Sequence, residues 1–422
     1  MGLVVVGLSL LVVGALQAPT TSTRHSTQFV PPATSVRHAA TDSVLDSAAV
    51  IAWRQFERLW VPESGLAKAT FDYDKLTTWD IGSVLAALYS ARVLGFLNDI
   101  EYRERVCRTL ETLEGMPLFQ DSVFHKLYDA RTGAMVDRNG RRTDRGYAWS
   151  ATDLGRFLLW LRIVGASDSS LTDLTARIAR RMKLDRVIAG GYMHGEDATP
   201  GRRRYHFQEG RIGYEQYAAR GFAVWGHDVA LAADINTNSQ PVTVYGVELP
   251  RDARGLDRLT SEPFVLLGLE VGWNAEEAKV ARALLEVQEA RFRRTGIMTI
   301  VSEDAVGIEP HYFYYYCIYC SGRPFVIEIS EPGRRLNSPR WQSTKATFAW
   351  HALLPGDYTA RAVARIQRAR ASVGWSSGVM ERSNAATRSY DINTAAVILE
   401  AAAYHRLGRP FLPRTALSAP AR

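Results

Sequence analysis

One acid and two phenols stand where an apolar helix begins. In residues 213–226, GYEQYAARGFAVWG, Glu215 lies between Tyr214 and Tyr217, and the residues that follow are those of a buried helix. An acid at a helix start can simply cap free amide groups and complement the helix dipole. Glutamate is a poor cap, however, so we expect Glu215 and its two tyrosines to face a functional cavity.

Three further apolar helices are predicted to begin with an acid near an aromatic residue. Their starts read TTWDIGS, WSATDLGR and RSYDINT, and they place Asp80, Asp153 and Asp391. For these three, capping alone is an equally good explanation. We interpret the shared start as a weak repeat of one helical hairpin, and RIGYEQYAARGF and TSEPFVLLGL as further starts with the acid displaced.

Carboxylates and flat aromatic rings in one concave site suit carbohydrates. A ring face packs on the C–H surface of a pyranose, and carboxylates accept hydrogen bonds from its hydroxyl groups. Glycoside hydrolysis also needs one protonated carboxyl as acid and a second as base or nucleophile. The candidate catalytic residues are Glu215, Glu381 and Asp80, and the candidate substrate-binding residues are Trp79, Trp149, Asp153, Tyr192, Glu196, Tyr214, Tyr217, Trp375 and Asp391.

Glu215 is the hypothesised general acid. Two neighbouring rings and a mostly buried helix would desolvate its carboxylate and raise its pKa, as acid catalysis requires, while the helix dipole opposes that shift. Glu381, or as second choice Asp80, would then activate water across the cleft.

Helical periodicity dominates the sequence beyond its N-terminal segment. The helices predicted at 81–97, 154–164 and 217–232 are apolar throughout, whereas those at 101–114 and 170–184 are amphipathic. A helix that is apolar on all sides must be surrounded by protein, and an amphipathic helix can cover it and face water. We therefore expect an all-α fold, an α/α toroid of helical hairpins with minor β-hairpin insertions, whose inner helices begin on one face.

The N-terminus has the pattern of an export signal followed by a tether. The apolar run from Leu3 to Leu16 is too short for a comfortable membrane span and suits a signal cleaved near Ala18, although it lacks a basic n-region. An uncleaved anchor, which would hold the protein at the cell envelope, is the alternative. We expect an exported protein, periplasmic or secreted, with residues 1–18 as signal or anchor, 19–42 as a flexible linker, 43–413 as the toroid and 414–422 as a disordered tail.

Composition and motifs exclude several other classes. The net charge of +7 comes without an arginine-rich tail or a nucleic-acid motif, so no nucleic-acid partner is expected. Cys317 and Cys320, in CIYC, lack two further ligands at zinc spacing, and we expect a reduced buried pair or a local disulfide. The sequence has no His-x-x-x-His pair, EF-hand loop, Walker loop or dinucleotide fingerprint, so no metal and no cofactor are expected.

Three blocks of the sequence resemble a known family. TTWDIGSVLAALYSARVLG, GYEQYAARGFAVWG and GWSSGVMERSNAATRSYDINTAAVILEAAAY are similar to a bacterial exported domain of unknown function, over roughly residues 48–412. That family is similar to the glucoamylase-like (α/α)-toroid glycoside hydrolases, which include endo-β-1,2-glucanases. The resemblance implies an (α/α)6 toroid and a glycan substrate. By matching position it also implies acidic roles for Glu215, Asp80 and Glu381.

The sequence thus favours an exported carbohydrate-active enzyme, an inverting glycoside hydrolase acting on a β-glucan or a bacterial exopolysaccharide. Its expected partner is the glycan, and the expected state is a monomer. A non-catalytic glycan-binding or scaffold domain in envelope polysaccharide export is the second hypothesis. A polysaccharide lyase, which needs a Tyr or His base and a cation that neutralises a uronate, is the third.

Overall fold

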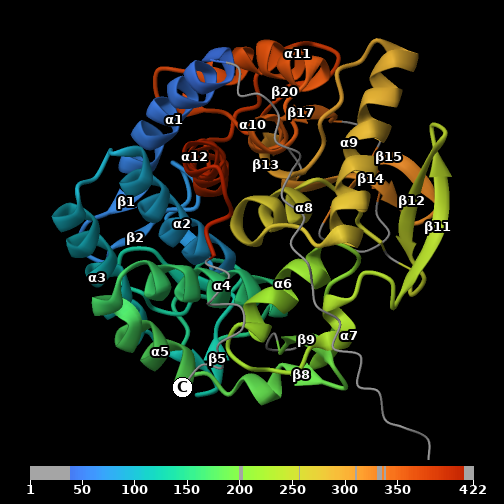
Figure 1. Cartoon of the computed structure of the whole chain (residues 1–422). Helices are drawn as coiled ribbons and strands as arrows, with labels where there is room; N and C mark the ends of the chain where they lie inside the picture. Colours follow the sequence, from blue (N-terminus) through green and yellow to red (C-terminus); the bar gives the residue numbers. More distant parts are fainter. Residues whose placement is uncertain are drawn as a thin grey trace, which may run out of the picture.

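A closed ring of six helices forms the centre of the molecule (Figure 1). The computed structural model describes residues 39–198, 203–255, 257–308, 311–329, 335–336 and 339–412. Each inner helix contacts the next one in chain order, and the last contacts the first. The inner helices are α2 (Thr78–Leu94), α4 (Ala151–Ser167), α6 (Tyr214–Ala223), α8 (Glu262–Leu266), α10 (Thr344–Leu353) and α12 (Ile392–Leu407).

A second set of helices alternates with the inner ones along the chain and covers them from outside. These are α1 (Ala39–Leu59), α3 (Asp99–Gly115), α5 (Thr172–Arg180), α7 (Ala230–Ala233), α9 (Ala275–Thr295) and α11 (Asp357–Ile366). Helix α2 buries 14 of its 17 residues but α3 only 5 of 17, as expected for an inner and an outer helix. The predicted predominance of helices is confirmed.

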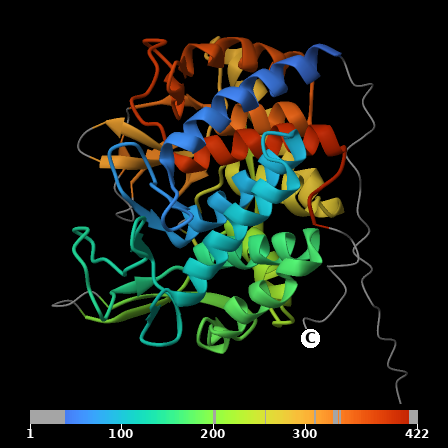
Figure 2. The same ribbon diagram turned by 90° about the vertical axis from the view of Figure 1, so that its left-hand side faces the viewer.

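Short antiparallel strand pairs gather at the end of the ring where the inner helices begin (Figure 2). Strands β3, β7 and β17 end within two residues of the starts of α2, α4 and α10. The strands of the first half are β1 (Trp60–Val61), β2 (Leu66–Ala67), β3 (Lys75–Thr77), β4 (Leu118–Phe119), β5 (Val123–Phe124), β6 (Leu127–Asp129), β7 (Ala148–Trp149), β8 (Ile188–Ala189), β9 (Tyr192–Asp197) and β10 (Tyr205–Gln208). Those of the second half are β11 (Ser239–Val244), β12 (Val247–Asp252), β13 (Glu303–Ile308), β14 (His311–Cys320), β15 (Arg323–Glu328), β16 (Arg335–Leu336), β17 (Trp341–Ser343), β18 (Arg370–Ala371), β19 (Gly374–Trp375) and β20 (Gly378–Met380).

Two helices differ from the sequence-based expectation. Residues 217–232 were expected to form one apolar helix, but α6 ends at Ala223 and only the single turn α7 follows. The cause is Gly226, whose φ of 87° lies in the left-handed region that a continuing helix cannot use. Helix α1 was not predicted, and it begins at Ala39, inside the expected linker.

The β structure is also larger than expected. Strands β13 to β16 form a four-stranded antiparallel sheet, whereas the sequence predicted only minor hairpins. This sheet matters for function because its first two strands reach the ring mouth, by which we mean the end of the ring where the inner helices begin.

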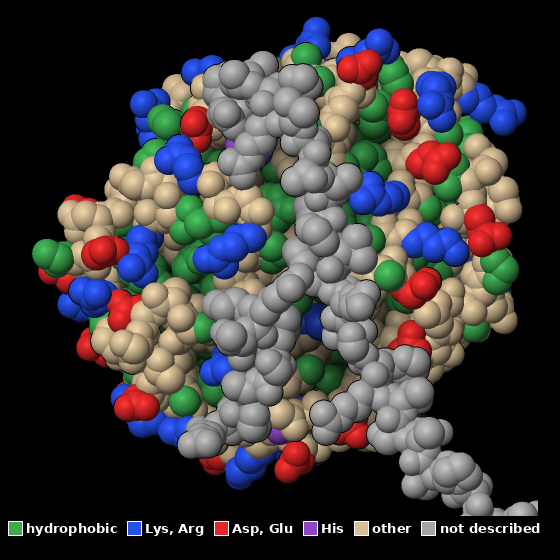
Figure 3. Space-filling view, viewed as in Figure 1, with side chains coloured by type: hydrophobic (Ala, Val, Ile, Leu, Met, Phe, Trp, Pro, Cys, Tyr) green, Lys and Arg blue, Asp and Glu red, His purple; other side chains and the backbone are tan. Residues whose placement is uncertain are grey.

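The predicted signal, the predicted tail and most of the predicted linker lie outside the described residues. Among the helices that the structure describes, none is long and apolar enough to cross a membrane. On the face shown in Figure 3, acidic and basic side chains are interspersed among hydrophobic ones.

One fully buried arginine links the inner helices. Arg156 of α4 donates from Nη1 to Glu270 Oε1 at 2.9 Å and to the Tyr217 hydroxyl at 3.0 Å, and from Nη2 to Glu400 Oε1 at 2.9 Å. Burial, and then the neighbouring charge of Glu270, raise the pKa of Glu400 well above its usual range. The cluster therefore joins one guanidinium to two buried carboxyl groups and a tyrosine hydroxyl. Its members come from α4, α6, α12 and the π-helical turn Leu267–Val271 that follows α8.

Helices α4 and α6 touch backbone to backbone. A Cβ atom on Gly221 would lie 1.8 Å from the carbonyl oxygen of Gly155, and one on Gly155 would lie 2.5 Å from the Cβ of Ala218. Only glycine fits at these two positions. The close approach brings the starts of the two helices, which carry Asp153 and Tyr214, next to each other at the ring mouth.

Replacing Arg156 by Met should lower the free energy of unfolding by about 3–5 kcal/mol, because Glu270 would stay buried without its cation. Denaturant unfolding measures the loss. Replacing Arg406, whose ion pair with Asp46 is half-exposed, is the matched control and should leave stability nearly unchanged. A loss for Arg156→Met no larger than that of the control would contradict the importance of the cluster.

Candidate active site

The beginnings of four inner helices bring acids together at the ring mouth. Asp80 and Asp153 lie in the first turns of α2 and α4, Glu262 is the first residue of α8, and Asp391 caps α12 through the Thr394 amide at 2.7 Å. Asp80 interacts electrostatically with both Asp391 and Asp153. Three of the acids predicted from the sequence therefore lie in one cluster.

Burial raises the pKa of two of these acids. It is the largest cause that raises the pKa of Asp80 to about 6, against two hydrogen bonds from Thr77 to Asp80 Oδ2 at 2.8 Å each. Burial likewise raises the pKa of Asp153 to about 7, with Lys126 opposing the shift and Glu209 adding to it. At neutral pH Asp80 is mostly ionised, and Asp153 is about half ionised.

A further acid comes from a strand rather than a helix. Glu303 begins β13, lies opposite Tyr315 of β14 in the sheet, and is 9% exposed. Burial, and then the charge of Glu262, raise its pKa to about 8, so its carboxyl is protonated at neutral pH. The Tyr214 hydroxyl lies beside it. Glu303 was not predicted, because nothing in the local sequence IMTIVSE distinguishes its acid from one in an ordinary strand.

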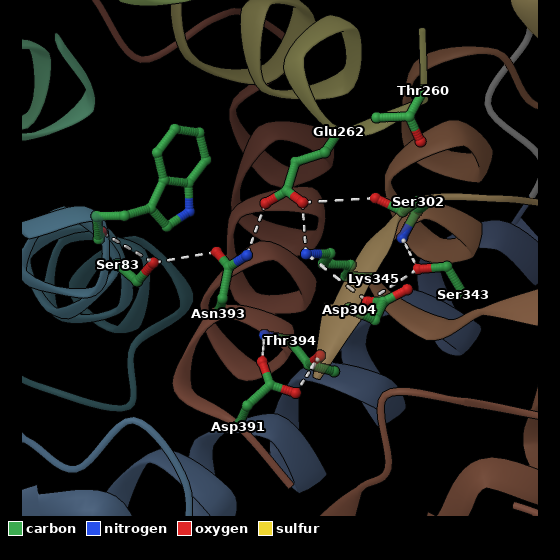
Figure 4. A network of polar contacts seen from close by, with 12 residues as sticks. Ser83, Thr260, Glu262, Ser302, Asp304, Ser343, Lys345, Asp391, Asn393 and Thr394 are labelled. Atoms are coloured by element: carbon green, nitrogen blue, oxygen red, sulfur yellow. Dashed lines mark hydrogen bonds and ion pairs between the residues drawn. The ribbon is translucent and has the colours of Figure 1, made fainter. Parts of the chain in front are cut away.

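Glu262 is held by a buried lysine and an asparagine (Figure 4). Lys345 Nζ lies 2.5 Å from Glu262 Oε2, and Asn393 Nδ2 donates to Oε1 at 2.6 Å. Lys345 also pairs with Asp304 at 3.6 Å. These contacts engage both oxygen atoms of Glu262 and fix its side chain. From this position the charge of Glu262 disfavours ionisation of Glu303. One feature of the sequence pointed to Glu262, namely its position in TSEPFVLLGL, which was interpreted as a helix start with a displaced acid.

Aromatic rings lie among these acids at the ring mouth. Trp79 lies edge-on to Tyr214, with ring centroids 6.0 Å apart. Tyr315 carries the guanidinium of Arg258 over its ring at 4.2 Å. Burial, and then the charges of Glu303 and Asp153, raise the pKa of Tyr315, which places this ring near both acids. Two predicted residues, Trp79 and Tyr214, thus lie close to the acid cluster, together with Tyr315, which was not predicted.

Glu215 faces away from this acid cluster. Arg254 binds both of its oxygen atoms, at 3.1 Å and 2.6 Å, and Gln208 donates to Oε1 at 2.6 Å. Gln208 and Glu209 are consecutive residues of an extended segment, so their side chains point to opposite sides. Glu209 lies beside Asp153, and Gln208, which binds Glu215, therefore points away from the acid cluster. Burial does raise the pKa of Glu215, but Arg254 opposes the shift. The structure therefore gives Glu215 a structural ion pair and does not support it as the general acid.

Glu381 also lies apart from the cavity. Arg291 of the outer helix α9 binds its two oxygen atoms at 2.8 Å and 2.9 Å, and the Tyr316 hydroxyl donates to Oε1 at 2.7 Å. Tyr315 and Tyr316 are consecutive in β14, so their side chains point to opposite faces. Since Tyr315 lies near the acids Glu303 and Asp153, Glu381 lies on the other side of the strand. The structure therefore does not bring Glu215 and Glu381 together, and each is bound by its own arginine.

Two other predicted residues support the β7–β9 pairing. Trp149 is buried, and its Nε1 donates to the His194 carbonyl at 2.9 Å. Glu196 is buried and forms ion pairs with Arg204 and, at 3.5 Å, with Arg186. Both side chains are engaged within the protein and do not join the acid cluster.

Three more predicted residues are used in packing. The hydroxyl of Tyr192 accepts a hydrogen bond from Asn238 Nδ2 at 3.2 Å. Tyr217 is fully buried in the Arg156 cluster, below the cavity. Trp375 is buried against α1, and its Nε1 donates to the Ala48 carbonyl at 3.0 Å.

The cysteine pair of CIYC lies in β14, and Cys317 and Cys320 are both buried free thiols. Among the residues that the structure describes, no group of three or more His, Cys, Asp or Glu side chains is placed to hold a metal ion.

Comparisons with known proteins support the resemblance seen in the sequence. Residues 47–408 match the model of a family described as "Protein of unknown function (DUF3131)". No curated protein matches the sequence significantly. Solved structures, in contrast, share the fold over most of the chain.

Three of these structures are informative. An endo-β-1,2-glucanase from Chitinophaga pinensis, in complex with sophorotriose and glucose, has a TM-score of 0.67 at 13% identity, over 90% of this chain and 96% of that one. A candidate glucoamylase from Bacteroides caccae has a TM-score of 0.65 at 15% identity, over 90% and 97%. A β-1,2-glucanase from Parabacteroides distasonis has a TM-score of 0.63 at 13% identity, over 90% and 59%. At these identities the likeness establishes the fold alone.

Replacing Glu303 by Gln should flatten the dependence of stability on pH. A carboxyl whose folded pKa is about 8 binds a proton in the folded state that the unfolded chain has already lost. Its stabilising contribution is therefore full below the unfolded pKa and disappears as pH rises to about 8. The same sign holds for Asp80 and Asp153, so the wild-type protein should lose stability between about pH 5 and pH 8.

Thermal unfolding across that pH range measures the effect. Glu303→Gln should show a shallower decline than the wild type, and Glu276→Gln, at an exposed position of α9, should show the wild-type decline. Equal slopes for the wild type and Glu303→Gln would show that Glu303 is ionised in the folded protein.

Proposed function

The chain belongs to the DUF3131 family, and we propose that it is a glycoside hydrolase that cleaves a β-glucan or a related bacterial exopolysaccharide. The observation that carries the proposal is the acid cluster at the ring mouth, where an ionised carboxylate, Asp80, and a protonated carboxyl, Glu303, lie among Trp79, Tyr214 and Tyr315. The fold that the chain shares with endo-β-1,2-glucanases supports a β-glucan as substrate. The helical ring is then an (α/α)6 toroid whose fourth outer helix is reduced to one turn.

Glu303 is the proposed general acid. Its pKa of about 8 lets it carry a proton at neutral pH and donate that proton to the leaving glycosidic oxygen. Glu262, fixed by Lys345 and Asn393, is a positioning residue that keeps the proton on Glu303 through its charge. Tyr214 lies beside both glutamates.

Asp80 is the proposed base. The hydrogen bonds from Thr77 orient its carboxylate through Oδ2, which leaves Oδ1 to accept a proton from the attacking water. In an inverting reaction the two carboxyls lie about 6.5–9.5 Å apart, so that water fits between the base and the sugar. Asp153 and Asp391 are placed beside Asp80 to accept hydrogen bonds from sugar hydroxyl groups.

The proposed place of action is outside the cytoplasm. The support is the apolar run from Leu3 to Leu16 and the polar segment that follows it. N-terminal sequencing of the exported protein should find a start shortly after Ala18. An intact Met1 in a cytoplasmic fraction would contradict export.

Activity should follow a bell-shaped pH profile, with limbs near pH 6 for Asp80 and near pH 8 for Glu303. On a panel of β-glucans that includes β-1,2-glucan, Glu303→Gln and Asp80→Asn should each lower kcat by about a hundredfold or more. Glu381→Gln keeps the shape of a carboxyl that lies outside the cavity, so it is the control and should retain kcat.

Other outcomes of the same assay would separate the alternatives. Binding of a glycan without release of reducing ends would identify a glycan-binding domain. Release of unsaturated products would identify a lyase. Full activity of Glu303→Gln would remove Glu303 from the reaction.

A further inference from the structure

We infer that the β9–β10 hairpin carries an aromatic platform, formed by Tyr205 and Phe207, which binds sugar units of a neutral glycan chain just outside the acid cavity. The inference rests on the proposed function of the ring mouth and adds a substrate preference. A protein with such a platform prefers a polymer or a long oligosaccharide to a short fragment.

The two rings form a continuous apolar surface. Tyr205 and Phe207 are two residues apart in β10, so their side chains share one face of the strand. Their ring centroids are 5.2 Å apart, and their planes differ by only 16°. Tyr205 is 63% exposed, which is unusual for a large aromatic side chain in a folded protein. The rings therefore stack on each other, and the outer face of such an exposed pair suits the C–H face of a pyranose unit.

The platform continues directly into the acid cluster. A Cβ atom on Gly195, opposite Phe207 in the hairpin, would lie 3.0 Å from Phe207 Cζ and 2.6 Å from Glu209 Oε2. The Phe207 ring and the Glu209 carboxylate therefore both lie over the space left by the missing side chain. Glu209 in turn accepts hydrogen bonds from the start of α4, including one from Ser150 at 2.8 Å, and lies beside Asp153. Tyr205, Phe207, Glu209 and Asp153 thus follow one another from the rim to the cavity.

The opposite face of the hairpin fixes the platform in position. His206, between the two aromatic residues, stacks on His194 with ring centroids 5.0 Å apart and packs edge-on against Trp149 at 6.2 Å. Strand β9 also pairs with β7, which leads into α4 (Figure 2). A platform held by a packed face loses little entropy when a sugar binds, since its rings are already ordered.

The surroundings of the platform favour a neutral glycan, since Arg204, which precedes Tyr205, is already paired with Glu196. The acids next to the platform are Glu209 and Asp153, and a uronate or a phosphorylated sugar would be repelled by them. Hydroxyl groups, in contrast, can donate to these carboxylates while the ring faces pack on the aromatic side chains.

Kinetics as a function of chain length test this inference. With a long neutral β-glucan, Tyr205→Ala and Phe207→Ala should each raise KM by about tenfold and leave kcat within about twofold, because the platform binds substrate far from the reacting bond. With the shortest oligosaccharide that is cleaved, both variants should match the wild type.

Two variants serve as controls. Tyr205→Phe, which keeps the ring, should retain the wild-type KM. Trp53→Ala, which removes an aromatic ring that stacks on Phe96 beyond the other end of α2, is the control for general loss of aromatic surface.

Direct binding separates a failure of this inference from a failure of the proposed reaction. Affinity for the long glycan is measured in the Glu303→Gln background, with and without Tyr205→Ala, and folding of each variant is checked by its melting temperature. Tenfold weaker binding in the double variant supports the platform even if no hydrolysis is ever found. Hydrolysis with KM unchanged in both alanine variants overturns the platform and leaves the reaction standing. A wild-type protein that neither binds nor cleaves any glycan of the panel overturns both.

Discussion

The arrangement of the ring depends on the buried Arg156 cluster. Six helices that start on one face crowd acidic first turns together, and such crowding is unfavourable unless the helices are held elsewhere. Arg156 holds four parts of the ring through Tyr217, Glu270 and Glu400. The same guanidinium lies 5.0 Å from the ring centroid of Trp79, the indole that packs on Tyr214. The floor of the cavity and the ion cluster below it are therefore one packed unit.

The acids of the protein fall into two groups according to whether a cation reaches them. Glu215, Glu381 and Glu262 each have an arginine or a lysine within 2.9 Å, and each is held in a fixed structural position. Among the described residues no arginine or lysine forms an ion pair with Asp80, Asp153 or Glu303, and their pKa values rise to about 6, 7 and 8. Desolvation, together with the charges of neighbouring carboxylates, thus gives the ring mouth carboxyls that titrate on either side of neutrality, as acid–base chemistry requires.

Much of the fold follows from local patterns, and much of the site does not. The alternation of apolar and amphipathic helices, and the acids at the starts of α2, α4 and α12, can be read from the sequence because each depends on neighbours within a turn or two. Glu215 is bound by Arg254, which is 39 residues away in the sequence, and Glu381 by Arg291, which is 90 residues away. These contacts make both glutamates structural. The role of Glu303 depends on which face of β13 meets the ring. Such long-range pairings decide which acids keep a proton, and no local pattern records them.

The most direct test of the central claim is the stereochemistry of the first product. Proton NMR of a fresh digest of a long β-glucan reports the anomer formed before mutarotation. Water activated by Asp80 and a proton supplied by Glu303 across the same cavity should release the α-anomer, the product of a single displacement with inversion. Release of the β-anomer would mean a covalent intermediate on a closer pair of carboxyls, and it would contradict the assignment of Asp80 as a base.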